Sequence, residues 1–69
     1  MPYIRLEVTE GVTRDQKTAV VREFTETLER VLGKRPEHIH IVIDEVREEN
    51  WGYHGMLTDD WRRHARREE

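Results

Sequence analysis

The sequence has 69 residues, of which 35% are hydrophobic, 39% are charged and none is cysteine. A chain this short forms one domain at most and buries only a thin core, and it has no disulfides or thiolate metal sites to support that core. Twelve Lys and Arg against 15 Asp and Glu leave a net charge of −3, so the composition does not indicate binding to nucleic acid. We expect a single domain over residues 1–69 that gains stability by self-association.

The N-terminal segment has none of the features of a targeting sequence. No run of about 18 apolar residues occurs anywhere, and the first residues lack the basic and apolar regions of a secretory signal. These observations predict a protein of the cytoplasm that has no membrane partner.

Residues 3–9 alternate between apolar and polar faces, with Ile4, Leu6 and Val8 on one side, and this pattern predicts a half-buried strand. The following Thr13-Arg14-Asp15-Gln16 is a capping-box sequence, which is typical of a helix start. Apolar residues then recur at helical spacing along one stripe, and Gly33 follows them at a position typical of a left-handed C-terminal cap. The sequence therefore predicts a helix from about residue 14 to residue 32.

Residues 38–46 contain the clearest second alternation, which places Ile39, Ile41 and Ile43 on one face. Two strands separated by a helix of this length predict a βαβ unit with a right-handed crossover and parallel strands. The helix should cover the isoleucine-bearing face. One face and both edges of such a sheet remain open, so we expect two copies to pair into four strands, with Trp51 and Tyr53 at the interface.

The C-terminal third carries weaker signals. Aromatic residues alternate with turn-forming glycines over residues 51–57, which predicts a loop or a short hairpin. Residues 58–69 show little apolar periodicity, so we expect a loosely ordered tail containing at most a Thr-capped helical turn. The tail is rich in arginine, but acidic residues surround its basic cluster, which favours a solvated, self-pairing end over a nucleic-acid contact.

Several of these features occur together in a fixed order. A proline directly follows Met1, the first strand ends in Glu10-Gly11, the helix begins Thr-x-x-Gln-Lys, and Glu-Asn-Trp-Gly-Tyr-x-Gly spans residues 49–55. Over residues 2 to about 57 the chain resembles the 4-oxalocrotonate tautomerase family. The resemblance implies an α/β (α+β) fold of the tautomerase/MIF-like type. In it, a βαβ subunit with a C-terminal hairpin pairs by two-fold symmetry into a four-stranded sheet, and assembles into a homodimer or a hexameric trimer of dimers.

The resemblance also implies a chemistry. Removal of Met1 would free Pro2 as a secondary amine, and an apolar pocket would keep that amine unprotonated and able to act as a general base. The implied activity is that of a cofactor-free tautomerase, an isomerase that interconverts the enol and keto forms of small unsaturated 2-oxo acids. Trp51 stands where the family places an aromatic wall beside the proline.

The sequence departs from the family at two substrate-binding positions. Val12 and His40 stand where well-known members carry arginines that bind the carboxylate or carbonyl groups of the substrate. A valine cannot bind an anion, whereas a histidine can donate a hydrogen bond or carry a charge. We therefore take His40 and Trp51 as candidate substrate-binding residues and add Arg14 and Arg35 as possible replacements. Lys34, His38 and Arg47 also lie near predicted loop or strand ends.

Two further interpretations of the same residues stay open. His38 and His40 form a His-x-His pair that could hold a metal ion with His54 or Asp44, although such a pair is more often polar patterning, and we predict no metal and no cofactor. A chain that has lost the family's arginines could also be a non-catalytic, oligomeric protein that binds small ligands on this fold.

Overall fold

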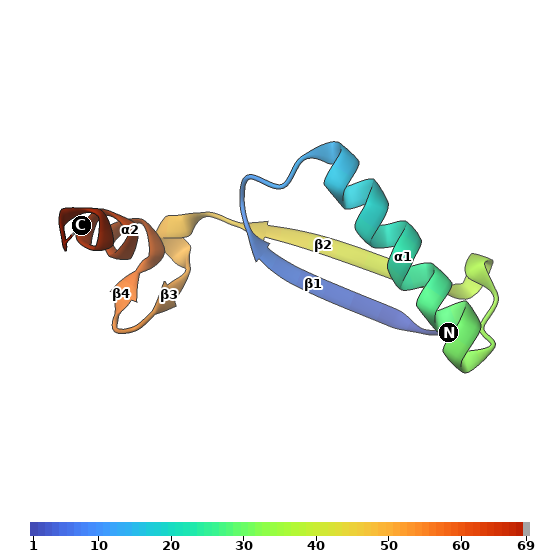
Figure 1. The fold of residues 1–69 in the computed structure, drawn as a ribbon. Coiled ribbons are helices and arrows are strands. Elements are labelled where there is room, and N and C mark those ends of the chain that lie inside the picture. Colours follow the sequence, from blue (N-terminus) through green and yellow to red (C-terminus); the bar gives the residue numbers. More distant parts are fainter. Residues whose placement is uncertain (69) are drawn as a thin grey trace.

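Two strands and the helix between them form one end of the molecule, which we call the βαβ body (Figure 1). In this computed structural model, which describes residues 1–68, the body consists of β1 (Tyr3–Thr9), α1 (Arg14–Leu32) and β2 (His40–Val46). The two strands pair in parallel, from Tyr3 opposite His40 to Thr9 opposite Val46. The predicted first strand, the helix and the parallel βαβ arrangement are confirmed.

Local sequence signals set both ends of α1. The Thr13 side chain accepts a hydrogen bond from the Gln16 backbone N–H at 3.1 Å, and the Gln16 side chain accepts one from the Thr13 backbone N–H at 2.9 Å. At the other end, Gly33 adopts a left-handed conformation with φ 65°, and its N–H donates to the Glu29 carbonyl. The reciprocal cap satisfies free N–H groups of the first turn, and the glycine closes the last turn without steric cost.

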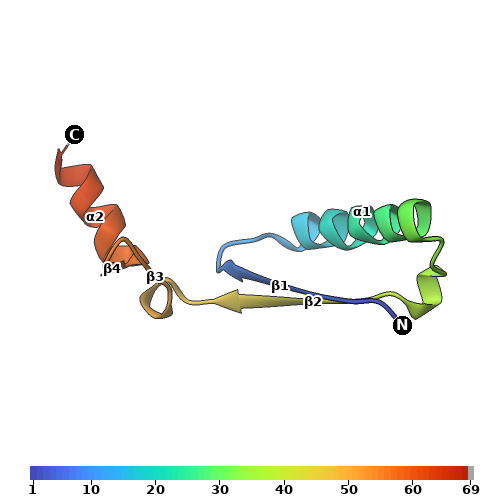
Figure 2. The same cartoon turned by 90° about the horizontal axis from the view of Figure 1, so that it is seen from below.

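The helix covers one face of the sheet and leaves the other open (Figure 2). Ile4, Leu6 and Val8 of β1 are half-buried, and so are Ile41 and Ile43 of β2. Tyr3, Arg5 and Glu7, which alternate with them along β1, are exposed on the opposite face. This is the predicted distribution of faces.

The second strand is shorter than the alternation suggested. Residues 36–38 form a short 3-10 turn, η1 (Pro36–His38), and the Ile39 N–H donates to the Pro36 carbonyl, so His38 lies outside the strand. Pairing also ends here, since β1 begins at Tyr3 and the Pro2 carbonyl accepts from the His40 N–H at 3.1 Å. The prediction of a strand from residue 38 is therefore wrong by two residues. A strand extends only as far as its partner, and that limit is not visible in its own alternation.

The remaining residues form a second unit, the C-terminal arm, which spans residues 47–68. It contains the 3-10 turn η2 (Glu48–Asn50), an antiparallel hairpin of β3 (Gly52–Tyr53) and β4 (Met56–Leu57), and the helix α2 (Thr58–Glu68). The predicted hairpin is confirmed. Its turn places His54 at φ 58° and Gly55 at φ 73°, a type I′ geometry that suits a two-residue connection. The arm projects beyond the sheet and packs mainly on itself (Figures 1 and 2).

The segment expected as a frayed tail forms an α-helix over Thr58–Glu68. The contacts that support it are tertiary. Thr58 bonds to Trp51, the Trp61 ring lies against the His54 ring at 4.5 Å between centroids, and Arg62 pairs with Glu48 at 3.3 Å. Sequence periodicity did not reveal these contacts because they join α2 to the hairpin and to η2 rather than to a broad apolar face.

No apolar side chain that the structure describes is buried from solvent. Large apolar side chains such as Tyr3, Val31 and Leu32 are more than half exposed. Neither α1 nor the described part of α2 has the length and apolar character needed to cross a membrane. The chain on its own therefore has the thin core that its composition predicted.

Candidate active site

Pro2 lies immediately before β1 and continues the half-buried series of Ile4, Leu6 and Val8 on the helix-covered face. Its carbonyl is held by the His40 N–H, which fixes the chain end against the start of β2. An apolar groove lined by Ile4, Phe24 and Leu28, together with Thr27, opens two residues further along β1. Pro2 therefore precedes a strand whose helix-covered face is apolar.

Two of the candidate substrate-binding residues lie at the same end of the sheet as Pro2. The His40 side chain is exposed on the open face, opposite Tyr3. Arg35 lies in the connection between α1 and β2, which returns the chain to the Pro2 end (Figures 1 and 2). Its guanidinium pairs with the Glu37 carboxylate at 2.8 Å, and both side chains are largely exposed.

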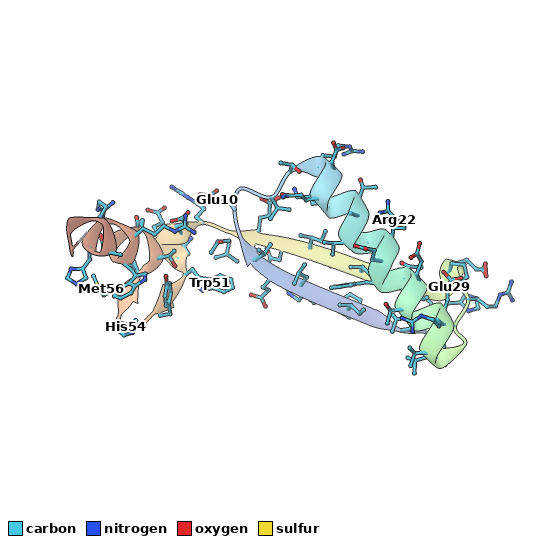
Figure 3. All side chains as sticks on the ribbon, viewed as in Figure 1. Glu10, Arg22, Glu29, Trp51, His54 and Met56 are labelled. Carbon is cyan, nitrogen blue, oxygen red and sulfur yellow. The ribbon has the colours of Figure 1, made fainter. Side chains whose placement is uncertain are left out.

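The other two candidates lie at the opposite end of the sheet. Arg14 opens α1 beyond the carboxyl end of β1, and it lines a shallow groove with Lys17, Val21 and Arg22 on α1. Trp51 follows the carboxyl end of β2, where the body meets the arm (Figure 3). The length of a seven-residue strand separates these groups from Pro2, which is about 20 Å at ~3.3 Å per residue. Within one chain the structure does not bring the predicted site residues together.

The cation nearest the middle of the open sheet face is already paired. Arg5 of β1 donates to the Asp44 carboxylate at 2.7 Å across the ladder and approaches Glu7 at 3.6 Å. The hydrogen bond to Asp44, and then its negative charge, raise the pKa of Arg5 above its ordinary value. This guanidinium therefore already has a carboxylate partner within the sheet.

Two contacts of Trp51 were missed by the sequence reasoning. Its carbonyl accepts hydrogen bonds from both the backbone N–H and the hydroxyl of Thr58, and its N–H donates to the Glu48 carbonyl. Thr58 was noted only as a possible cap for a helical turn. No local signal identifies its partner, because that contact spans seven residues and depends on the hairpin.

The histidines do not form the pair considered for a metal ion. His38 lies in η1 and His40 in β2, so they do not alternate along one strand, and His54 lies on the arm. Within residues 1–68, no three His, Asp or Glu side chains gather as a metal site would require.

Comparison with known proteins identifies the family. The sequence model of one family, described as tautomerase enzyme, matches residues 2–60. The chain belongs to the tautomerase family. A probable tautomerase from Listeria monocytogenes is 35% identical over 60 residues, which cover 87% of this chain and 98% of that protein. Another, from Dickeya dadantii, is 36% identical over 66 residues and covers 94% and 98%.

Solved structures agree with this assignment. The crystal structure of a 4-oxalocrotonate tautomerase homologue superposes with a TM-score of 0.83 at 32% identity, over 87% of this chain and 95% of that one. DmpI from Helicobacter pylori gives 0.81 at 28% identity, over 90% and 97%. The predicted fold is confirmed, and the family match supports a tautomerase-type function for this chain. The family match ends at residue 60, so most of α2 lies beyond it.

Proposed function

We propose that this tautomerase catalyses the enol–keto interconversion of small unsaturated 2-oxo acids without a cofactor, using the amine of Pro2 as its general base. The neutral amine removes a proton from the enol, and the resulting ammonium returns that proton to a carbon of the conjugated system. The reaction is balanced, since one proton leaves one atom and is delivered to another. It requires that Met1 be removed, because an internal prolyl nitrogen is an amide and has no basicity.

The position of Pro2 supports this role. The residue is half-buried at the end of the helix-covered face, two residues before Ile4, which lines an apolar groove with Leu28. An apolar surrounding disfavours the charged form of an amine, so the pKa of a terminal Pro2 should fall below the ~7.7–8.0 of an ordinary chain terminus. A base with a pKa near neutrality combines a large unprotonated fraction with useful basicity.

The separation of the candidate residues supports a site shared between copies. Pro2, His40 and Arg35 lie at one end of the sheet, whereas Trp51 and Arg14 lie at the other. No described apolar side chain is buried, and β1 and β2 form a two-strand sheet in which each strand keeps one free edge. A second copy would cover these surfaces and supply its own Trp51 as the pocket wall. We propose a homodimer or homohexamer on this basis.

The polar contacts to the substrate differ from those of a site with two arginines. Val12 is half-buried and offers no charge, so His40 and Arg35 are left to bind the 2-oxo acid at the Pro2 end. A hydrogen bond from His40 or a charge from Arg35 would stabilise the enolate oxygen that forms during proton transfer. We propose a monocarboxylate as the first substrate to test.

The test is the ketonisation of phenylenolpyruvate, a monocarboxylate enol, followed by absorbance. Protein whose intact mass shows that Met1 is absent should accelerate the reaction, and Pro2→Ala should lower kcat/KM by at least about 100-fold, since general-base catalysis contributes ~10²–10⁴-fold. Pro36→Ala is the matched control. It makes the same change at the chain's other proline, whose nitrogen is an amide, and should retain most of the activity.

The same measurement addresses the alternative function. A protein that binds 2-oxo acids without converting them would show saturable binding but no ketonisation, and Pro2→Ala would leave its affinity largely unchanged. That result would favour an oligomeric binding protein on the tautomerase fold. The sequence feature that favours this alternative is that Val12 and His40 stand where well-known family members carry arginines.

A further inference from the structure

Thr58 is the only buried residue among those the structure describes, with 3% of its surface exposed. A polar side chain is thus the most enclosed group in a chain that buries no described apolar side chain. Burial of a hydroxyl is unfavourable unless a hydrogen bond compensates for it. The partner of the Thr58 hydroxyl is therefore of interest.

Both donors of Thr58 converge on one acceptor. The hydroxyl donates to the Trp51 carbonyl oxygen at 2.6 Å, and the Thr58 backbone N–H donates to the same oxygen at 2.8 Å. The Trp51 N–H in turn donates to the Glu48 carbonyl at 3.3 Å. The hydrogen bonds that the structure gives to the Trp51 backbone thus come from within the arm.

The rest of the arm holds Thr58 in place. Thr58 begins α2, and three residues later the Trp61 ring lies 4.5 Å from the His54 ring and 6.1 Å from the Tyr53 ring, centroid to centroid. Aromatic contacts therefore join the hairpin to α2, and two hydrogen bonds join Thr58, the first residue of α2, to the Trp51 carbonyl. Figure 3 shows His54 and Met56 on the arm, and Trp51 where the arm meets the body.

From these contacts we infer that Thr58 is a positioning residue for Trp51. It fixes the backbone of the pocket wall through its hydroxyl, so that the indole meets the substrate in one orientation. The inference rests on the proposed function, in which Trp51 walls the pocket that contains Pro2. A purely structural Thr58 would stabilise the arm without acting through Trp51, and the two roles give different results in a mutant cycle.

The experiment compares Thr58→Val with Thr58→Ser, each alone and combined with Trp51→Ala. Valine keeps the shape and the backbone bond but removes the hydroxyl, whereas serine keeps the hydroxyl. We expect Thr58→Val to raise KM about three- to tenfold with kcat nearly unchanged, as the loss of one hydrogen bond would. Thr58→Ser should stay close to the wild type. In the Trp51→Ala background, Thr58→Val should cause no further change, because its effect passes through the indole.

A second measurement does not depend on activity. Trp51 and Trp61 are the only tryptophans, so Trp61→Phe leaves Trp51 as the single fluorophore. In that background, Thr58→Val should make Trp51 more accessible to acrylamide quenching, and Thr58→Ser should not. If the protein shows no ketonisation at all, the proposed function fails, and the quenching experiment still decides whether Thr58 places Trp51.

Three results would overturn the inference. They are an unchanged KM and unchanged quenching in Thr58→Val, an equal effect of Thr58→Val with and without Trp51, and a Thr58→Ser variant as impaired as Thr58→Val. Any of these would leave Thr58 as a stabilising residue of the arm or as a residue of no consequence.

Discussion

The βαβ body and the C-terminal arm are held together by different interactions. The body uses a parallel ladder and an amphipathic helix that covers half-buried isoleucine, leucine and valine side chains. The arm uses one buried threonine, aromatic contacts around Trp61 and an ion pair between Arg62 and Glu48. The difference separates two tasks. We expect the body to supply most of the stability and to hold the proposed base, whereas the arm carries the proposed wall.

Truncation of one apolar side chain in each unit tests this division most strongly. Ile43→Ala removes a side chain from the helix-covered face of β2 and should lower the free energy of unfolding by about 2–3 kcal/mol, the lower part of the range for such changes because Ile43 is half-buried. Leu57→Ala in β4, which is 44% exposed, should cost less than about 1 kcal/mol. Urea unfolding at one protein concentration measures both. Equal losses would contradict the division.

Two of the three glycines with positive φ provide a finer comparison. Gly33 ends α1 with φ 65° and Gly55 lies in the hairpin turn with φ 73°, and neither has an atom within 4 Å of an added methyl group. The cost of alanine is therefore backbone strain alone, about 1–2 kcal/mol at either site. Gly33→Ala should lower the melting temperature of the helical circular dichroism signal, whereas Gly55→Ala should mainly change Trp61 fluorescence. A larger thermal effect from Gly55→Ala would reverse the assignment of stability to the body.

The smallest expected effect concerns an ion pair that joins α1 to β2. The hydrogen bond from Lys17 lowers the pKa of Glu45 below its ordinary value of 4.5, assisted by the charge of Lys17 and the Gly11 backbone N–H. A carboxyl with a depressed pKa contributes stability above pH ~4.5 and loses it as the pH falls through the folded value. Glu45→Gln should reduce the slope of the unfolding free energy against pH on the acid side, by the equivalent of less than one proton taken up on unfolding. An unchanged limb would show that the pair does not contribute.

The body could be predicted from the sequence because its signals are local. The Thr13–Gln16 capping box, the αL residue Gly33 and the alternation around Ile4 each act within a few residues, and all three are confirmed. The start of β2 could not be predicted, since it depends on where β1 begins. The arm was underestimated for the same reason: Thr58 and Trp61 stabilise α2 through partners on other elements.

The candidate site shows the same limit. A resemblance could nominate Pro2 and Trp51, but only the parallel register shows that the length of a strand separates them in one chain. The predicted parallel βαβ unit already implied that Arg14 and Arg35, at the two ends of the helix, lie at opposite ends of the sheet, but it could not show which of them belongs to the site. The roles of these residues stay predictions until the assembled protein is assayed.

The most direct test of the account is the pH dependence of kcat/KM for phenylenolpyruvate, measured on protein whose mass confirms that Pro2 is the first residue. We predict an ascending limb governed by one group with a pKa below the ~7.7 of an ordinary chain terminus. In Pro2→Ala, whose terminal group is a primary amine, kcat/KM should fall and the limb should move toward that ordinary value. An active protein that retains Met1, or a Pro2→Ala variant with unchanged kcat/KM and an unchanged limb, would contradict the assignment of Pro2 as the base.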